Sequence, residues 1–336
     1  MTRNAITQKH SCVSRRLSAI LAMIGLMAGC AGGAQADTRE VVVYPGFGAS
    51  RFVVEGRVIE ARADRPEAQD DSWFTNLRRT LRRLINDEQG KVTLRVRLGT
   101  GEWPVHTDAE GYFRVEAQIP PGVTAGWQVV EVVTESGDAR AGGAVLLVPA
   151  DNRLGIITDL DDTILVSDVT DKSRLVRKTL LENYAQRQAV AGTAEYYARL
   201  AQRNPQPAAA PLFYLSASPR QLHAGIQTFL DRNGFPRGVL ITKKITNDKT
   251  SEPLIDQVRY KVMRIEQLLT ALPQVRFVLV GDDGERDPEI YDEIRQRYPE
   301  RIEAVWIRKV SQDSARPVYA GQGDLATALG GARKEQ

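Results

Sequence analysis

Residues 154–164, LGIITDLDDTI, decide how the second half of the chain is read. The apolar run Leu154–Thr158 predicts a buried β-strand, and the acidic cluster Asp159-Leu160-Asp161-Asp162 follows it at once. Carboxylates this close together raise each other's pKa unless a cation neutralises them. Because Mg²⁺ prefers carboxylate oxygens, the stretch predicts a metal-assisted site where the strand ends. The alternative is an ordinary polar turn in which Asp162 or Thr163 caps a helix.

Asp159 and Asp161 are two residues apart, so in an extended segment they would face the same way. A same-facing pair of carboxyl groups suits one nucleophile and one proton-transfer group.

From Leu154 onward, apolar strands alternate with helical stretches, which predicts an α/β doubly wound parallel sheet with ligands at the carboxyl ends of its strands. The strands are expected at Leu154–Thr158, Leu212–Ser216, Val239–Thr242, Arg276–Val280 and Ile302–Ile307. The helices are expected at Thr193–Gln202, Gln221–Asn233, Tyr260–Leu272 and Pro288–Arg297.

Three further polar features fall where these elements begin or end. Ser216 ends one strand, Lys261 opens a helix, and Gly281-Asp282-Asp283-Gly284-Glu285-Arg286-Asp287 follows another strand. Taken singly, each has an ordinary explanation as a helix cap, a solvated lysine or an acidic turn. Their occurrence together, in this order, is hard to attribute to chance.

The order D-x-D-x-T, strand-Ser, Lys and G-D-x-x-x-x-D resembles the haloacid dehalogenase phosphatase superfamily. The flanks of these motifs, including Phe213–Pro219 and Asp287–Tyr291, are similar to the actin-patch-type phosphatidate phosphatases and their bacterial relatives, which are distantly lipin-like. The resemblance covers about residues 150–310.

The resemblance implies a mechanism with an aspartyl-phosphate on Asp159 and with Asp161 as general acid and base. Thr163 completes the first motif, Ser216 would donate a hydrogen bond to the phosphoryl group, and Lys261 would neutralise charge. Mg²⁺ would be held by Asp159, the backbone carbonyl of Asp161 and Asp282. Asp283 or Asp287 would give support, and the spacing does not choose between them.

Receiver domains of response regulators share several of these parts. They place their acid pair before the strand of the phospho-acceptor, whereas here Asp161 follows Asp159 and a second acidic motif follows Lys261. An enzyme is therefore favoured over a signalling module.

Residues 37–150 predict a smaller, β-sandwich-like domain, because short β-rich runs are separated by turn signals. A helical insert with the apolar face Trp73, Phe74, Leu77, Leu81, Leu84 and Ile85 interrupts it. The strands are expected at Val41–Val43, Phe52–Ile59, Val92–Leu98, Tyr112–Ala117, Gln128–Thr134 and Ala144–Val148.

Residues 1–36 predict a signal peptide, with a basic start, an apolar run from Leu17 to Ala28 and the cleavage pattern Ala34-Gln35-Ala36. The expected location is the periplasm, and lipid anchoring through Cys30 is an alternative.

Without this segment the chain has 41 basic and 42 acidic residues, so general nucleic-acid binding is not expected. The only cysteines, Cys12 and Cys30, lie within the segment, which excludes thiol chemistry from the mature protein.

The substrate prediction rests on the family and on two hints of a membrane surface. The stretch between Thr163 and Leu212 is the expected cap, with the basic residues Arg174, Arg177, Lys178 and Arg187. The insert of the first domain carries Arg78, Arg79, Arg82 and Arg83 beside its apolar face. Ordinary solvated helices would look the same. The predicted substrate is phosphatidate or a related lipid phosphate, and the alternatives are soluble phosphomonoesters, phosphoproteins or a non-catalytic binding role. The catalytic domain is expected at residues 151–312, followed by a tail at 313–336.

Overall fold

The computed structural model describes residues 39–61, 90–166, 187–245, 252, 256–313 and 315–330, all within one unit, Thr38–Gln336. Several predictions lie outside these residues: the signal peptide and Cys30, the helical insert of the first domain with its arginines, and Arg174, Arg177 and Lys178 of the expected cap.

The second half of the chain forms a six-stranded sheet in which every neighbouring pair is parallel. The strand order is β10-β9-β8-β11-β12-β13, so β8 lies inside the sheet between β9 and β11. The strands are β8 (Leu154–Asp159), β9 (Leu212–Pro219), β10 (Val239–Lys243), β11 (Arg276–Asp282), β12 (Ile302–Arg308) and β13 (Gln322–Asp324).

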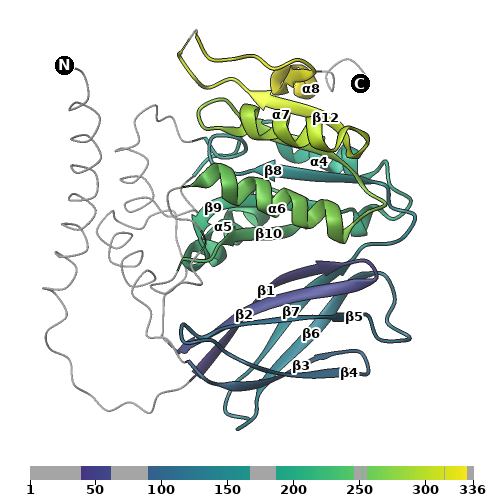
Figure 1. Cartoon of the computed structure of the whole chain (residues 1–336), viewed down its shortest axis with the longest axis vertical. Coiled ribbons are helices and arrows are strands. Elements are labelled where there is room, and N and C mark those ends of the chain that lie inside the picture. The colour runs from purple at the N-terminus through teal and green to yellow at the C-terminus, as the bar shows by residue number, and fades with distance from the viewer. Residues whose placement is uncertain are drawn as a thin grey trace, which may run out of the picture. The chain divides into compact units, whose positions relative to one another are not determined.

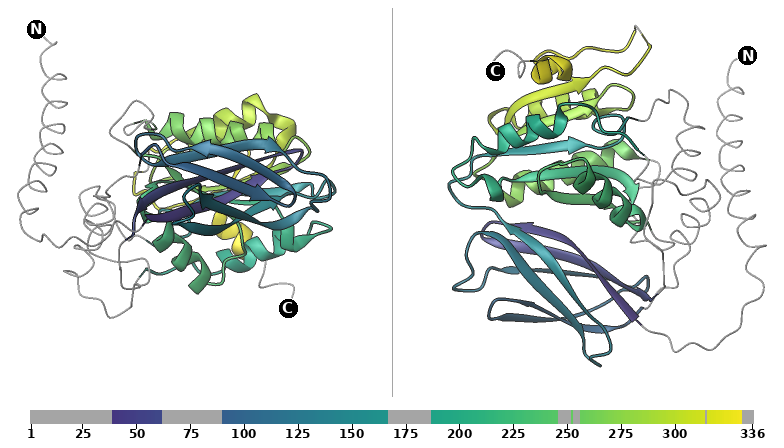
Figure 2. Two further views of the ribbon diagram at one scale, coloured as in Figure 1. Left: turned by 90° about the horizontal axis from the view of Figure 1, so that it is seen from below. Right: turned by 180° about the vertical axis from the view of Figure 1, so that it is seen from behind.

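Helices cover both faces of this sheet (Figures 1 and 2). One face packs against α6 (Gln257–Ala271) and α7 (Asp287–Arg297). The other face packs against α4 (Thr193–Ala201), α5 (His223–Arg232) and α8 (Leu325–Gly330). Short 3₁₀ turns lie at Pro207–Ala209, Arg220–Leu222 and Pro299–Arg301. With both faces covered, the strands are buried along their length, and polar chemistry is confined to the strand ends.

The last two elements, β13 and α8, lie beyond residue 312, where the sequence predicted only a tail. Strand β13 has three residues, Gln-Gly-Asp, none of them apolar, so no periodicity announces it. It extends the sheet by pairing with β12, and Leu325 of α8 is buried in the core.

The first domain is a seven-stranded sheet of order β4-β3-β6-β7-β1-β2-β5. The sequence predicted a sandwich; in the structure β1 pairs antiparallel with β2 and parallel with β7, which joins all seven strands into one sheet around a single core. The strands are β1 (Arg39–Gly48), β2 (Arg51–Glu60), β3 (Thr93–Leu98), β4 (Gly101–His106), β5 (Tyr112–Gln118), β6 (Gly126–Thr134) and β7 (Arg140–Leu147).

Strand β4 was not predicted from the sequence. It contains Pro104, which cannot donate a hydrogen bond to a neighbouring strand. The structure places β4 at the edge of the sheet, where a proline is tolerated.

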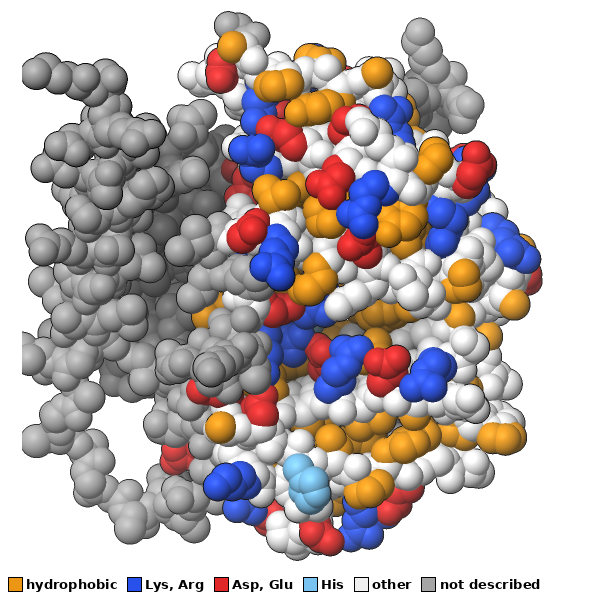
Figure 3. Space-filling model, viewed as in Figure 1, with side chains coloured by type: hydrophobic (Ala, Val, Ile, Leu, Met, Phe, Trp, Pro, Cys, Tyr) orange, Lys and Arg blue, Asp and Glu red, His pale blue; other side chains and the backbone are white. Residues whose placement is uncertain are grey.

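The two sheets share part of their apolar core. Leu146 of β7 and Val148 just after it belong to the same buried cluster as Phe213 of β9 and Leu268 of α6. On the face shown in Figure 3, basic and acidic side chains are interspersed among the described residues. Among those residues, no helix has the length and apolar character needed to cross a membrane.

Candidate active site

Asp159 ends β8, the strand between β9 and β11, and its side chain is buried. The chain then leaves the strand through a turn at residues 161–164. In that turn Asp162 has a φ of 59°, and its carbonyl accepts a hydrogen bond of 2.5 Å from Nη1 of Arg308 in β12. A left-handed conformation at a non-glycine residue is costly, and such residues cluster at functional sites.

Three buried carboxyl groups meet at this edge of the sheet. Asp159, Asp282 and Asp287 each offer one oxygen, and the three oxygens lie within 4.8 Å of one another. Asp282 ends β11, and Asp287 is the first residue of α7. The backbone nearby has no spare room, because a Cβ atom on Gly281 would lie 2.5 Å from Oδ2 of Asp287.

Lys261 of α6 is the cation that faces this group. Its Nζ lies 2.8 Å from Oδ1 of Asp159, 2.5 Å from Oδ1 of Asp287 and 3.6 Å from Oε2 of Glu285. Burial lowers the pKa of Lys261, but Asp159 and Asp287 outweigh that effect and raise it well above its ordinary value. Lys261 therefore stays charged.

One lysine does not neutralise these carboxyl groups. Burial, together with Asp287 and Asp282, raises the pKa of Asp159 well above its ordinary value although Lys261 opposes the shift. Burial and the neighbouring Asp287 raise the pKa of Asp282 to about 8. Among the residues that the structure describes, the cluster thus has more acidic groups than cations, and its oxygen-only donor set fits a small hard cation such as Mg²⁺.

Thr163 links two members of the cluster. Its hydroxyl lies 3.2 Å from Oδ2 of Asp159 and 3.0 Å from Oδ2 of Asp282, so it can donate its proton to either carboxylate. The threonine of the D-x-D-x-T motif is therefore in direct contact with the predicted nucleophile.

Ser216 lies beside this group, because Asp159 pairs with Leu215 across the parallel strands β8 and β9. Ser216 is buried, and its Oγ accepts a hydrogen bond of 3.0 Å from the N–H of Ser218. Since that bond uses a lone pair, the hydroxyl proton of Ser216 can still be donated to a ligand.

Asp161 does not belong to the three-carboxyl group. The alternation of a strand ends at Asp159, so the turn sends the two side chains to different surroundings. Asp161 is partly exposed; its Oδ2 lies 3.4 Å from Oγ of Ser218, and its Oδ1 lies 3.8 Å from Nη1 of Arg187. One of its contacts, Ser218, lies in β9, the strand that also carries Ser216.

Asp283 is also separate from the three-carboxyl group. Its Oδ1 accepts hydrogen bonds from the N–H groups of Val310 (2.6 Å) and Ser311 (2.7 Å), which follow β12. The sequence left open whether Asp283 or Asp287 supports the metal. In the structure Asp287 lies in the three-carboxyl cluster, whereas Asp283 binds the loop that follows β12.

Sequence reasoning gave no role to Glu285 or Arg308, and it treated Arg187 only as part of a basic cap. Glu285 lies within the acidic stretch 281–287, so the sequence alone could have marked it as a candidate site residue. The contacts of Arg187 and Arg308 join residues far apart in the chain, so no local pattern announces them.

Part of the chain is similar to known proteins. Residues 154–309 match the family model for the catalytic domain of phosphatidate phosphatase APP1. The matched segment contains every residue of the cluster and supports a phosphatase enzyme in this part of the chain.

Two fungal relatives are similar to the chain over part of its length. Phosphatidate phosphatase APP1 of Saccharomyces cerevisiae is 30% identical over 155 residues, 46% of this chain and 26% of the relative. An uncharacterized protein of Schizosaccharomyces pombe is 28% identical over 218 residues, 63% of this chain and 35% of the relative. The chain thus spans about a quarter to a third of their lengths. The solved structure of a carbohydrate acetylesterase from Xanthomonas citri has 9% sequence identity to this chain and a TM-score of 0.28, over 79% of this chain and 66% of the other, which is too weak a likeness to show a shared fold.

Proposed function

We propose that the chain is a Mg²⁺-dependent phosphatase that forms an aspartyl-phosphate on Asp159 and acts on phosphatidate or a related lipid phosphate. One observation carries the proposal. The segment that matches the phosphatidate phosphatase catalytic domain brings a buried aspartate together with a lysine, a threonine and two further carboxyl groups.

The residues divide the reaction between them. Asp159 attacks phosphorus, and the bond from phosphorus to the leaving alcohol breaks as Asp161 gives that oxygen a proton. In the second step Asp161 takes a proton from water, the water oxygen attacks phosphorus, and the bond to Asp159 breaks. Asp161 suits this role because it is partly exposed and lies next to Ser218 of β9, the strand that also carries Ser216.

The remaining groups position the reacting atoms and neutralise negative charge. Lys261 and Thr163 hold the two carboxylate oxygens of Asp159, which fixes the direction of attack. Ser216 donates to an oxygen of the phosphoryl group. A Mg²⁺ ion held by Asp159, Asp282 and Asp287, with the carbonyl of Asp161, would supply the positive charge that phosphoryl transfer requires.

Three wider assignments belong to the same proposal. Residues 151–312 would be a haloacid dehalogenase-type domain, supported by the D-x-D-x-T motif and a parallel sheet covered on both faces. Export to the periplasm, with lipid anchoring at Cys30 as the alternative, rests on residues 1–36 alone. Contact with a membrane surface rests on the basic residues of the predicted insert and of the expected cap.

The test is phosphate release from phosphatidate in mixed micelles and from p-nitrophenyl phosphate, each with Mg²⁺, with EDTA and with Asp159→Asn. We expect Mg²⁺-dependent release from phosphatidate that exceeds release from the small ester and disappears in the variant. Release from the small ester alone would keep the mechanism and favour a soluble phosphomonoester or a phosphoprotein as substrate. Release in EDTA or from Asp159→Asn would overturn the mechanism.

A further inference from the structure

The first domain reaches the catalytic edge of the parallel sheet through two ion pairs. Glu55 of β2 pairs with Arg220, the residue after β9. Asp108 pairs with Lys244, the residue after β10, at 2.7 Å. Both cations therefore stand at the carboxyl ends of strands, on the edge that carries Asp159 and Ser216.

Arg220 is held on several sides. Its guanidinium is buried, its Nε donates a hydrogen bond of 3.3 Å to the carbonyl of Thr242 in β10, and it lies 5.3 Å from the ring centre of Tyr44. Burial tends to raise the pKa of Glu55, but Arg220, with Arg264 and Arg114, lowers it to about 2. Glu55 is thus a permanent anion opposite a permanent cation.

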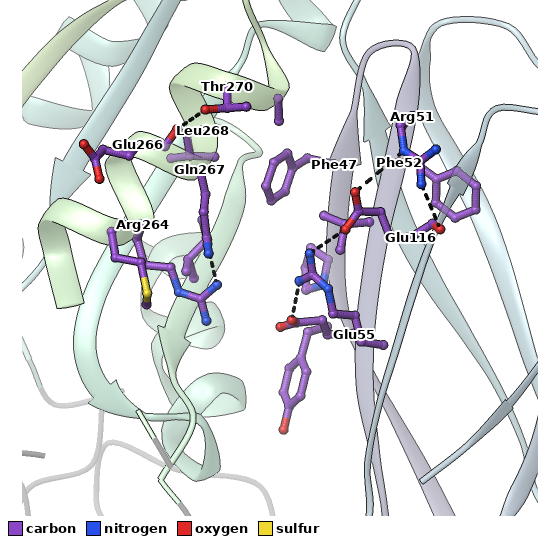
Figure 4. A pocket seen from close by; sticks show the side chains of 18 of the residues that line it. Phe47, Arg51, Phe52, Glu55, Glu116, Arg264, Glu266, Gln267, Leu268 and Thr270 are labelled. Carbon is purple, nitrogen blue, oxygen red and sulfur yellow. Dashed lines mark hydrogen bonds and ion pairs between the residues drawn. The ribbon is translucent and has the colours of Figure 1, made fainter. Parts of the chain in front are cut away.

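A cavity of about 560 Å³ adjoins this ion pair and is lined by both domains. Figure 4 shows Glu55 and Arg264 on opposite walls, with Arg264 coming from α6, the helix that also carries Lys261. The side chains of the two domains do not fill this cavity. Apolar packing therefore holds the domains together less tightly here, and we expect the ion pairs to contribute more to their relative position.

Arg220 is separated from Ser216 by three residues, and the segment between them is held at both ends. At one end Ser216 accepts the N–H of Ser218, and the Ser218 hydroxyl lies 3.4 Å from Asp161. At the other end Arg220 is fixed by Glu55. A shift of Arg220 would therefore move the hydroxyl that faces the phosphoryl group and the neighbour of the general acid.

We infer that Glu55, acting through Arg220, is a positioning residue for Ser216, and that the first domain is a working part of the catalytic site. The inference rests on the proposed function, because it concerns the same phosphoryl site. It gives the first domain a task that the sequence did not show. Misplacement of a positioned group by about 1 Å can cost up to about 100-fold in rate.

The experiment compares full-chain Glu55→Gln with Glu102→Gln, which removes an exposed ion pair with Arg97 in the same domain. We expect Glu55→Gln to lower kcat for the preferred substrate by about 10- to 100-fold with KM changed less than about threefold. Glu102→Gln should match the wild type. When Ser216 is already replaced by alanine, adding Glu55→Gln should lower kcat by less than a further factor of about two, because the effects of residues that act together are not additive. An equal loss in both backgrounds, or an unchanged kcat, overturns the inference.

Hydrogen exchange of residues 212–222 provides a readout that does not need activity. Exchange should rise in Glu55→Gln and stay at the wild-type level in Glu102→Gln. If the wild type releases no phosphate, the proposed function fails, and the exchange result still decides the positioning role. Arg220→Lys, which alters the same ion pair from its other side, replaces Glu55→Gln if that variant does not fold.

Discussion

At Asp159 the needs of catalysis and of folding oppose each other. The carboxyl group is buried with Asp282 and Asp287 nearby, and these surroundings raise its pKa. Asp159→Asn should abolish phosphate release, by at least about 1,000-fold. In EDTA it should raise Tm by a few degrees, because one of three crowded acidic groups is replaced by a neutral amide while Lys261 keeps Asp287 and Glu285.

The control for this prediction is the same pair of melts in excess Mg²⁺. An ion that binds only the folded state stabilises it, so the wild type should gain more Tm from Mg²⁺ than Asp159→Asn does. A variant that melts several degrees below the wild type in EDTA would show that Asp159 contributes to folding and would contradict the argument.

Asp287 and Asp283 form a matched pair for testing the metal site. Asp287 belongs to the three-carboxyl cluster, whereas Asp283 accepts two backbone N–H groups of a loop. Asp287→Asn should raise the Mg²⁺ concentration for half-maximal activity more than about tenfold, and Asp283→Asn should change it less than about twofold. Mg²⁺ titrations of both variants measure this, and the reverse order would exchange their roles.

The sequence predicted several site residues because each one follows a strand or opens a helix. Asp159 and Asp282 meet in the structure because they end β8 and β11. Helix α6 begins at Gln257, three residues before the predicted start at Tyr260, so Lys261 does not open it and reaches Asp159 from the second turn. The choice between Asp283 and Asp287 could not be made, since it depends on a helix that begins at Asp287 and turns this carboxyl group back toward β11. Asp161 was expected to face the same way as Asp159, but β8 ends at Asp159, two residues before Asp161, so the alternation of a strand does not extend to it.

Lys261 lies near the N-terminus of helix α6, so the start of this helix determines where the lysine is placed. Asp256 caps the helix, with Oδ1 accepting the N–H of Arg259 at 2.8 Å. Asp256→Ala should cost about 1 kcal/mol of unfolding free energy, and Asp256→Asn, which keeps an N-capping oxygen, only a few tenths. Urea unfolding of both variants tests this, and equal losses would show that the cap bond contributes nothing.

The last strand and helix test how much of the fold lies beyond the sequence pattern. Element α8 packs Leu325 into the core that holds Tyr197 and Ile156. Leu325→Ala should therefore destabilise the protein by about 2–4 kcal/mol, as expected for a buried leucine, although the sequence predicted a tail there. Ala328→Gly tests helix propensity in the same element and should cost no more than about 1 kcal/mol. An unchanged urea midpoint for Leu325→Ala would restore the prediction of a tail.

The elements that the sequence predicted well are long and strongly patterned. Strands β8, β9 and β11 were predicted within three residues of their observed ends, because continuous apolar runs mark buried parallel strands. Strands β4 and β13 lack such runs, and only pairing with β3 and β12 defines them. Tertiary contacts, not local preference, decide those elements.

On the scale of the whole molecule, the junction of the two domains should be sensitive to acid. His223 begins α5 and lies 5.1 Å from the ring centre of Tyr44 in β1. Burial, and then the nearby Arg220, lowers the pKa of His223 to about 4. Its Nε2 is buried without a hydrogen-bond partner among the described residues, and a backbone hydrogen bond at Leu240 opposes the lowering of the His223 pKa without reversing it.

This shift sets the direction of the pH effect. As the pH falls, the unfolded chain binds a proton on His223 near pH 6.5, whereas the folded protein does so only near pH 4. The contribution to stability is therefore intact above pH 6.5 and is lost progressively toward pH 4.

Between pH 7.5 and pH 5 the unfolding free energy of the wild type should fall by about 2 kcal/mol because of this residue. In His223→Gln the loss should be smaller by that amount, while His106→Gln, at an exposed histidine of β4, should follow the wild type. Urea unfolding at the two pH values measures the difference, and parallel losses in all three proteins would mean that His223 is protonated equally in the folded and unfolded states.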